Sequence, residues 1–164
     1  STDTGCFVYS NTTPDTHRVA AALMDTGIDY RSVNKRHFRT KSFKRLRLES
    51  MITEGMDLFD NGTIAIAAVT LDMMKALDAH EEDAEDIAAF AGQIEGVETA
   101  VTIRELRPGE CKLSVRPSAG PNPSAVCALR GGGGQAAAAG CSVMGTVADA
   151  KAAILDAIRQ IQQG

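Results

Sequence analysis

The feature that most constrains this chain is the stretch RGGGGQAAAAG, from Arg130 to Gly140, where four consecutive glycines precede a glutamine and four alanines. Ordering a glycine costs more backbone entropy than ordering any other residue. A folded chain is therefore expected to keep such a run only where its backbone has to be bare. Tight apolar sequence flanks the run, which disfavours a loop that merely connects a helix to a strand, although that alternative stays open.

Glycine-rich backbone is also used to bind phosphate groups. A Walker-type or dinucleotide loop does not fit, because no G-K-[ST] follows and the run comes after a predicted helix and not after a strand. A cradle fits better, since bare N–H groups can converge on an anion and small alanines keep the floor open. The residues expected to bind phosphate are Gly131, Gly132, Gly133, Gly134 and Gln135, the last through its amide N–H.

A hairpin precedes this run. The alternating stretches VETAVTIREL and CKLSVRP, joined by the turn RPGE, predict two antiparallel strands over residues 97–117. On the second strand the apolar residues share one face, so Lys112, Ser114 and Arg116 share the other. The guanidinium of Arg116 can clasp two phosphate oxygens, and the short connection to the glycines makes it a second candidate. An exposed arginine at a strand end is the alternative interpretation.

The rest of the chain alternates helices and strands. A strand is predicted to end in CFVYS, and a helix follows from Thr13 and Pro14 to the stop at Gly27. TIAIAAVT and AGCSVM are typical of strands, and residues 71–91 look mostly helical. A short helix is capped by Asn122, and an amphipathic helix begins at a capping box of Thr146 and Asp149. This order predicts an α/β fold with a mixed central sheet and flanking helices.

Composition and charge narrow the function. The four cysteines have no metal-ligand spacing, so we expect them to be packing residues in a reducing cytoplasm. No apolar run approaches the length of a membrane span. The net charge is −4, yet eight of the 17 basic residues lie between Arg31 and Arg47. That segment either attracts a polyanion or is a solvated helix face.

Four stretches together resemble one family. They are TDTGCFVYSNTTPDTHRVAAAL, IEGVETAVTIREL, KLSVRPSAG and RGGGGQAAAAG, and their order is similar to that in the DHH phosphoesterase superfamily. The nearest branch contains the nano-RNase and 3′-phosphoadenosine 5′-phosphate phosphatases, which are related to RecJ-type exonucleases. The resemblance implies that residues 1–27 are the end of a catalytic domain, residues 28–58 a helical linker, and residues 59–164 the DHH-associated domain that grips the substrate.

In that family the catalytic domain holds two Mn²⁺ or Mg²⁺ ions. By the resemblance, Asp3 in TDTG corresponds to the last metal-ligand aspartate, but this sequence contains no D-H-H triplet and no H-x-D-x-D segment. One carboxylate cannot hold two divalent ions. We therefore expect the chain to be the C-terminal part of a longer enzyme. The intact enzyme would hold the Mn²⁺ or Mg²⁺ ions, whereas this part alone would bind no metal and would not catalyse the reaction.

The resemblance also assigns the substrate contacts. Arg116 matches the family's substrate-gripping arginine, and Gly131 to Gly134 match its G-G-G-H loop. The next residue departs from the family, because Gln135 stands where the family has histidine. Glutamine keeps a hydrogen-bond donor but loses the positive charge that imidazole can carry.

The resemblance therefore implies a hydrolase of short oligoribonucleotides or 3′-phosphoadenosine 5′-phosphate, located in the cytoplasm, with this part binding the substrate's phosphate. We expect the partner to be a short RNA or a nucleotide, and we expect this part of the protein not to bind a membrane. A homodimer remains an open alternative. Two alternatives remain at this point. One is an RNA-binding module without chemistry, and the other is a cyclic-dinucleotide phosphodiesterase of the same superfamily.

Overall fold

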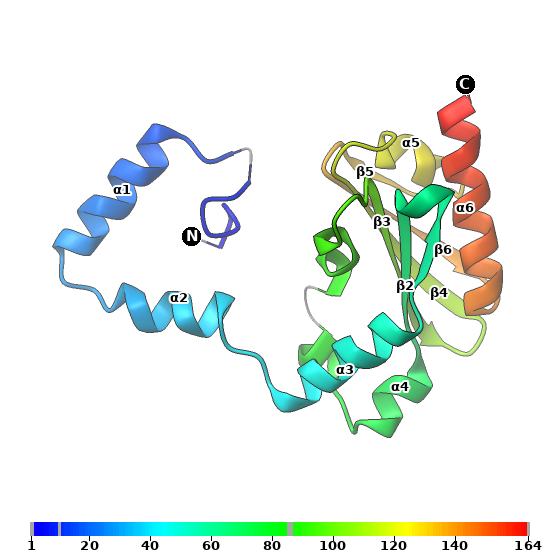
Figure 1. Cartoon of the computed structure of the whole chain (residues 1–164), viewed down its shortest axis with the longest axis horizontal. Coiled ribbons are helices and arrows are strands. Elements are labelled where there is room, and N and C mark those ends of the chain that lie inside the picture. Colours follow the sequence, from blue (N-terminus) through cyan, green and yellow to red (C-terminus); the bar gives the residue numbers. More distant parts are fainter. Residues whose placement is uncertain (1, 10, 85–86, 164) are drawn as a thin grey trace. The chain divides into compact units, whose positions relative to one another are not determined.

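The computed structural model describes residues 2–9, 11–84 and 87–163, and it forms two compact units, Ser1–Ser42 and Phe43–Gly164 (Figure 1). The division falls inside the predicted linker, residues 28–58, so the second half of that segment belongs to the larger unit. The three-part division at residues 27 and 58 stays a prediction.

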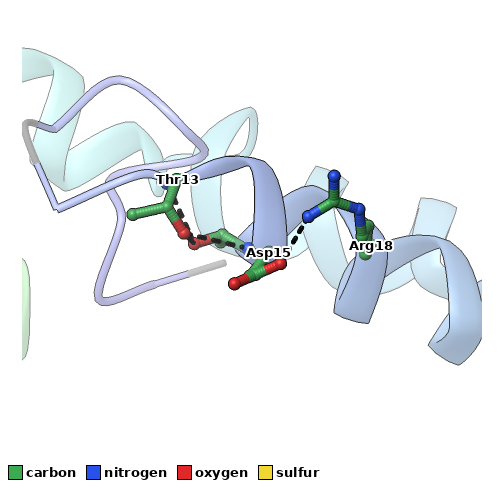
Figure 2. Close-up of polar contacts among 4 residues, drawn as sticks. Thr13, Asp15 and Arg18 are labelled. Carbon is green, nitrogen blue, oxygen red and sulfur yellow. Dashed lines mark hydrogen bonds and ion pairs between the residues drawn. The ribbon is translucent and has the colours of Figure 1, made fainter.

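The smaller unit contains helices α1 (Pro14–Asp25) and α2 (Tyr30–Phe38). Thr13 caps α1 as predicted, because its hydroxyl accepts from the Thr16 amide and the Thr16 hydroxyl accepts from the Thr13 amide. Figure 2 shows this cap and the Asp15–Arg18 ion pair in the first turns of α1. Neither helix buries a residue.

The strand predicted over CFVYS is wrong for the part that the structure describes. Residues 6–9 form turns, and Ser10 lies outside the described residues. Gly5, Cys6 and Phe7 have φ of 55°, 57° and 69°, a left-handed backbone that no strand adopts. Alternation alone cannot make a strand without a neighbour to pair with.

The larger unit is built on a six-stranded sheet with the order β1-β2-β3-β4-β6-β5. β2 and β3 pair in parallel and the other neighbours pair antiparallel, so the mixed sheet predicted from the sequence is confirmed. β3 and β4 are the predicted hairpin. The strands are β1 (Asp57–Phe59), β2 (Ile64–Val69), β3 (Thr99–Arg107), β4 (Glu110–Pro117), β5 (Gly133–Gln135) and β6 (Ala138–Met144).

Two separate hydrophobic clusters lie on the two faces of this sheet. On one face, α5 (Pro123–Ala128) and α6 (Val147–Gln163) pack against residues from β2, β3, β4 and β6 (Figure 1). On the other face, α3 (Phe43–Glu54) and the segment from α4 (Leu71–Ala76) to Ile94 pack against β2 and β3. Leu48 and Ile52 of α3 are fully buried there. α3 is therefore part of the core of this unit.

The region after α4 is less helical than predicted. α4 stops at Ala76, and Asp78 has φ of 47°. Short 3-10 turns follow, namely η2 (Glu81–Ala84), η3 (Ile87–Ala89) and η4 (Ala91–Gln93), while η1 (Asp60–Gly62) precedes β2. Glu85 and Asp86 of the acidic stretch lie outside the described residues. The left-handed backbone at Asp78 ends the helix before the acidic stretch begins.

Candidate functional site

The first glycine of the run ends a helix. The Gly131 amide donates to the Ala128 carbonyl at 3.1 Å, and the Gly132 amide donates to the Cys127 carbonyl at 2.9 Å. Together with φ of 72° at Gly131, these bonds form a Schellman motif at the end of α5. Gly131 is therefore needed because residues with a Cβ are strained in that conformation.

Two further glycines are needed for close packing against β6. A Cβ on Gly132 would lie 2.2 Å from the carbonyl oxygen of Gly140. A Cβ on Gly134 would lie 2.5 Å from the carbonyl oxygen of Ala138. Backbone atoms cannot move aside as a flexible side chain can, so neither position accepts a larger residue without a shift of β5 or β6.

The glycine run is not the loop that we expected. Gly133–Gln135 form the edge strand β5, which pairs with β6 across a two-residue turn at Ala136 and Ala137. In a paired edge strand the N–H groups point alternately toward the neighbour and toward the free edge. The backbone of this segment therefore does not converge on one point, and a phosphate there has to be held by side chains as well.

Gly133 differs from its neighbours because no structural reason for a glycine is found there. An added Cβ would meet no atom within 4 Å, and the residue is exposed. Its partner across the ladder is Gly140, so this part of the sheet surface carries no side chains at all. Among the four glycines, Gly133 is the one whose missing side chain leaves exposed backbone that packing does not require.

The strand register brings Gln135 into the same row as Arg116. Val115 pairs with Ala139 and Gln135 pairs with Ala138; one step further along the register, Arg116 lies opposite Ala138. Arg116 and Gln135 are thus two strands apart, with Cα atoms separated by ~10 Å. Both side chains are long and only an alanine stands between them, so both can reach one ligand.

These residues share the face of the sheet opposite α5 and α6. Val115 and Ala139 are buried in the core under α6, so the residues next to them in sequence point the other way. We call the resulting surface the open face. Every one of its residues is exposed or half-buried, and it consists of Lys112, Ser114, Arg116, Gly133, Gln135, Ala138, Gly140 and Ser142.

The charges on the open face are unpaired. Within the described part of the chain, Arg116 and Lys112 make no ion pair and no side-chain hydrogen bond, and both are exposed. By contrast, the guanidinium of Arg130, directly before the glycines, donates to the Ala153 carbonyl at 2.8 Å and to Asp156 at 2.8 Å. Arg130 therefore fixes α5 against α6, and Arg116 remains available for an anion.

The basic segment between Arg31 and Arg47 is divided between the two units. In the larger unit, Lys44 pairs with Asp78 at 3.0 Å and Arg45 pairs with Glu49 at 2.8 Å. The Arg45–Glu49 pair is mostly buried, so these two charges stabilise α3 locally. The remaining cations lie mainly on α2 in the smaller unit.

The residues that the structure describes do not fit a two-ion metal site. Asp3 is exposed, and its backbone carbonyl accepts a hydrogen bond from the Asn11 amide at 3.0 Å. No group of three or more histidine, cysteine, aspartate or glutamate residues suited to a metal occurs among residues 2–9, 11–84 and 87–163. Two divalent ions would therefore need ligands that these described residues do not supply.

The cysteines confirm the packing role predicted for most of them. Cys111, Cys127 and Cys141 are free and buried, and Cys6 is half-buried. Burial raises the pKa of the Cys127 thiol to about 12, and the neighbouring Cys141 adds to the shift. A protonated thiol is a poor nucleophile and a poor metal ligand. Among the described residues, no helix is long and apolar enough to cross a membrane.

Comparison with known proteins identifies a curated relative. No family model matches the chain. It is 32% identical over 161 residues to the bifunctional oligoribonuclease and PAP phosphatase NrnA of Thermus thermophilus, a match that covers 97% of this chain and 47% of the relative. The chain therefore spans about half the length of the curated relative that it matches.

Solved structures agree with this similarity. An exopolyphosphatase-related protein from Bacteroides fragilis superposes with a TM-score of 0.86 at 25% identity, over 97% of this chain and 47% of that protein. The pGpG-specific phosphodiesterase PggH from Vibrio cholerae superposes with a TM-score of 0.51 at 14% identity, over 73% of this chain and 39% of that protein. The latter shows a shared fold alone. The resemblance predicted from the sequence motifs is confirmed.

The candidate surface contains some residues that the sequence singled out and others that it did not. Arg116 and Gln135 were predicted, and the register places them in one row. Ala138, Gly140 and Ser142 of β6 were not predicted, although the buried residues Ala139 and Cys141 on that strand carried a signal. Alternation along β6 would have placed their neighbours on the open face.

Proposed function

We propose, from the premise that this chain is a relative of the DHH superfamily phosphoesterases, that its larger unit binds the phosphate of a nucleotide or short oligoribonucleotide on the open face. The observation that supports this most is the row Arg116, Ala138, Gln135 with bare backbone at Gly133 beside it. The row therefore places a cation and an amide donor within reach of one ligand, next to backbone that carries no side chains.

The chemistry of the row suits a phosphate group. The guanidinium of Arg116 can donate two parallel N–H bonds to two phosphate oxygens, and these charge-assisted bonds are stronger than neutral ones. The amide of Gln135 can donate to a third oxygen. Because Gly133 and Gly140 lack side chains, the attached ribose or base can approach the sheet closely.

We assign hydrolysis to a longer parent enzyme and not to this chain alone. The described residues supply binding and orientation, and they lack the clustered carboxylates and histidines that two divalent ions need. Short oligoribonucleotides and 3′-phosphoadenosine 5′-phosphate are the proposed substrates, because the relative from Thermus thermophilus is named for both activities.

Amide chemical-shift mapping tests the location of the site. We expect 3′-phosphoadenosine 5′-phosphate, titrated into the ¹⁵N-labelled chain, to shift the amides of Arg116, Gly133 and Gln135 in a saturable way. The amides of α6 on the opposite face serve as the internal reference. Shifts confined to α1 and α2, or no saturable shift at all, would contradict the proposal.

A further inference from the structure

We infer that the open face carries a second phosphate contact, at Lys112, which engages an oligoribonucleotide of several residues but not a single nucleotide. This inference rests on the proposed function. It extends that proposal from one phosphate at Arg116 to the path that the rest of the ligand follows.

The path follows from the strand register. Lys112 and Arg116 lie on the same face of β4, four residues apart, so their Cα atoms are separated by ~13 Å. Lys112 pairs with Ser142 of β6, as Ser114 pairs with Gly140. The open face therefore has three rows: Arg116 with Ala138 and Gln135, Ser114 with Gly140 and Gly133, and Lys112 with Ser142.

The middle row contains only small residues. Ser114 is half-buried, and Gly140 and Gly133 have no side chains. The small side chains of this row let an extended backbone lie close to the sheet, with its phosphates near the outer rows and its sugars or bases above the glycines. Arginine and lysine at the two ends provide the positive charge that tracks a single strand.

The usual explanation for a lysine on a sheet does not apply to Lys112. Lysines often protect edge strands from pairing with other chains. β4 is not an edge strand, because it lies between β3 and β6. The neighbouring cation Arg104, on β3 opposite Lys112, forms an ion pair with Glu81. Lys112 is exposed and makes no ion pair with any described residue. An unpaired cation on a central strand is available to a ligand.

The substitution Lys112→Ala in the full chain tests this inference with two probes, a tetraribonucleotide and 3′-phosphoadenosine 5′-phosphate. We expect the variant to bind the tetraribonucleotide roughly threefold more weakly, as for an exposed charge pair. The plot of log affinity against log salt concentration should become shallower, with the magnitude of its negative slope smaller by ~0.7, the value for one phosphate contact on a single strand. Binding of the mononucleotide should not change.

Lys75→Ala is the matched control, because Lys75 is also exposed, on α4, and has the same charge. It should alter neither probe. Equal weakening of both probes by Lys112→Ala would overturn the inference, because it would place Lys112 at the same phosphate as Arg116. No effect on either probe, while Arg116→Ala weakens both, would also overturn it and leave the proposed function intact. Loss of the Arg116 effect as well would overturn the proposed function itself.

Discussion

Gly132 is crowded by β6, whereas its neighbour Gly133 faces open space. Substitutions at the two positions therefore distinguish an effect on stability from an effect on binding. We expect Gly132→Ala to destabilise the larger unit by ~1–3 kcal/mol, because its Cβ would collide with the Gly140 carbonyl. Gly133→Ala should change the free energy of unfolding by less than ~0.5 kcal/mol, since its Cβ meets nothing. Urea unfolding measures both.

Gly133→Ala should leave stability almost unchanged but should reduce phosphate affinity. Gly133→Ala places a methyl group on the open face and should weaken binding of 3′-phosphoadenosine 5′-phosphate. A Gly133→Ala variant with unchanged affinity would remove Gly133 from the site, and one that is as unstable as Gly132→Ala would contradict the steric assignment.

Gln135 is the position where the sequence departs from the family's histidine. We expect Gln135→His to bind phosphate more tightly below about pH 6.5, where an unperturbed imidazole becomes protonated and adds a positive charge beside Arg116. Above that pH, affinity should be close to that of the unsubstituted chain. Titrations between pH 5.5 and 8, chosen to span the imidazole pKa of about 6.5, test this. Gln160→His, on the exposed side of α6, is the control. A pH dependence equal to that of the unsubstituted chain would contradict the prediction.

Among the elements, α6 depends on a capping box that responds to pH. The Asp149 carboxylate accepts from the Thr146 amide at 2.8 Å and from the Thr146 hydroxyl at 2.7 Å. These bonds lower the pKa of Asp149 below its usual 3.8. A lowered folded-state pKa means that the stabilisation is complete above the unfolded pKa and is lost as the pH falls through the folded value.

Asp149→Asn should therefore reduce the dependence of unfolding free energy on pH below about pH 4. Unfolding in urea at a series of pH values from neutral to acid measures the two profiles, and the difference between them isolates this carboxyl group. Parallel profiles for the two proteins would show that the capping box does not contribute to acid sensitivity.

The elements predicted correctly are those whose signals are local. The caps at Thr13 and Thr146 and the alternation of the β3–β4 hairpin depend on residues near one another in sequence, and all are confirmed. β5 was missed because glycine disfavours strands and because the turn at Ala136 and Ala137 lacks the usual Asn-Gly signal. Pairing with β6, a tertiary effect, overrides the local preference.

The candidate site was predictable to the same extent. Side-chain chemistry identified Arg116 and Gln135, but their placement in one row depends on the register of β4 with β6 and of β6 with β5. The register cannot be read from a sequence in which one of the three strands is not recognised as a strand. The open face therefore became visible only in the structure.

At the scale of the molecule, α3 decides where the larger unit begins. The predicted linker includes it, yet Leu48 is fully buried in the cluster beneath β2 and β3. Leu48→Ala should lower the free energy of unfolding of the larger unit by ~2–5 kcal/mol, as for other buried leucines. A cost below about 0.5 kcal/mol, typical of an exposed site, would support a linker instead.

The central claim is that a phosphate binds beside Arg116, and calorimetric titration of the whole chain with 3′-phosphoadenosine 5′-phosphate tests it most directly. Arg116→Ala should bind about tenfold to a hundredfold more weakly, because a charge-assisted bond contributes roughly 1.5–3 kcal/mol. Lys75→Ala should match the unsubstituted chain. Equal affinities for all three proteins, or no binding by any of them, would contradict the account.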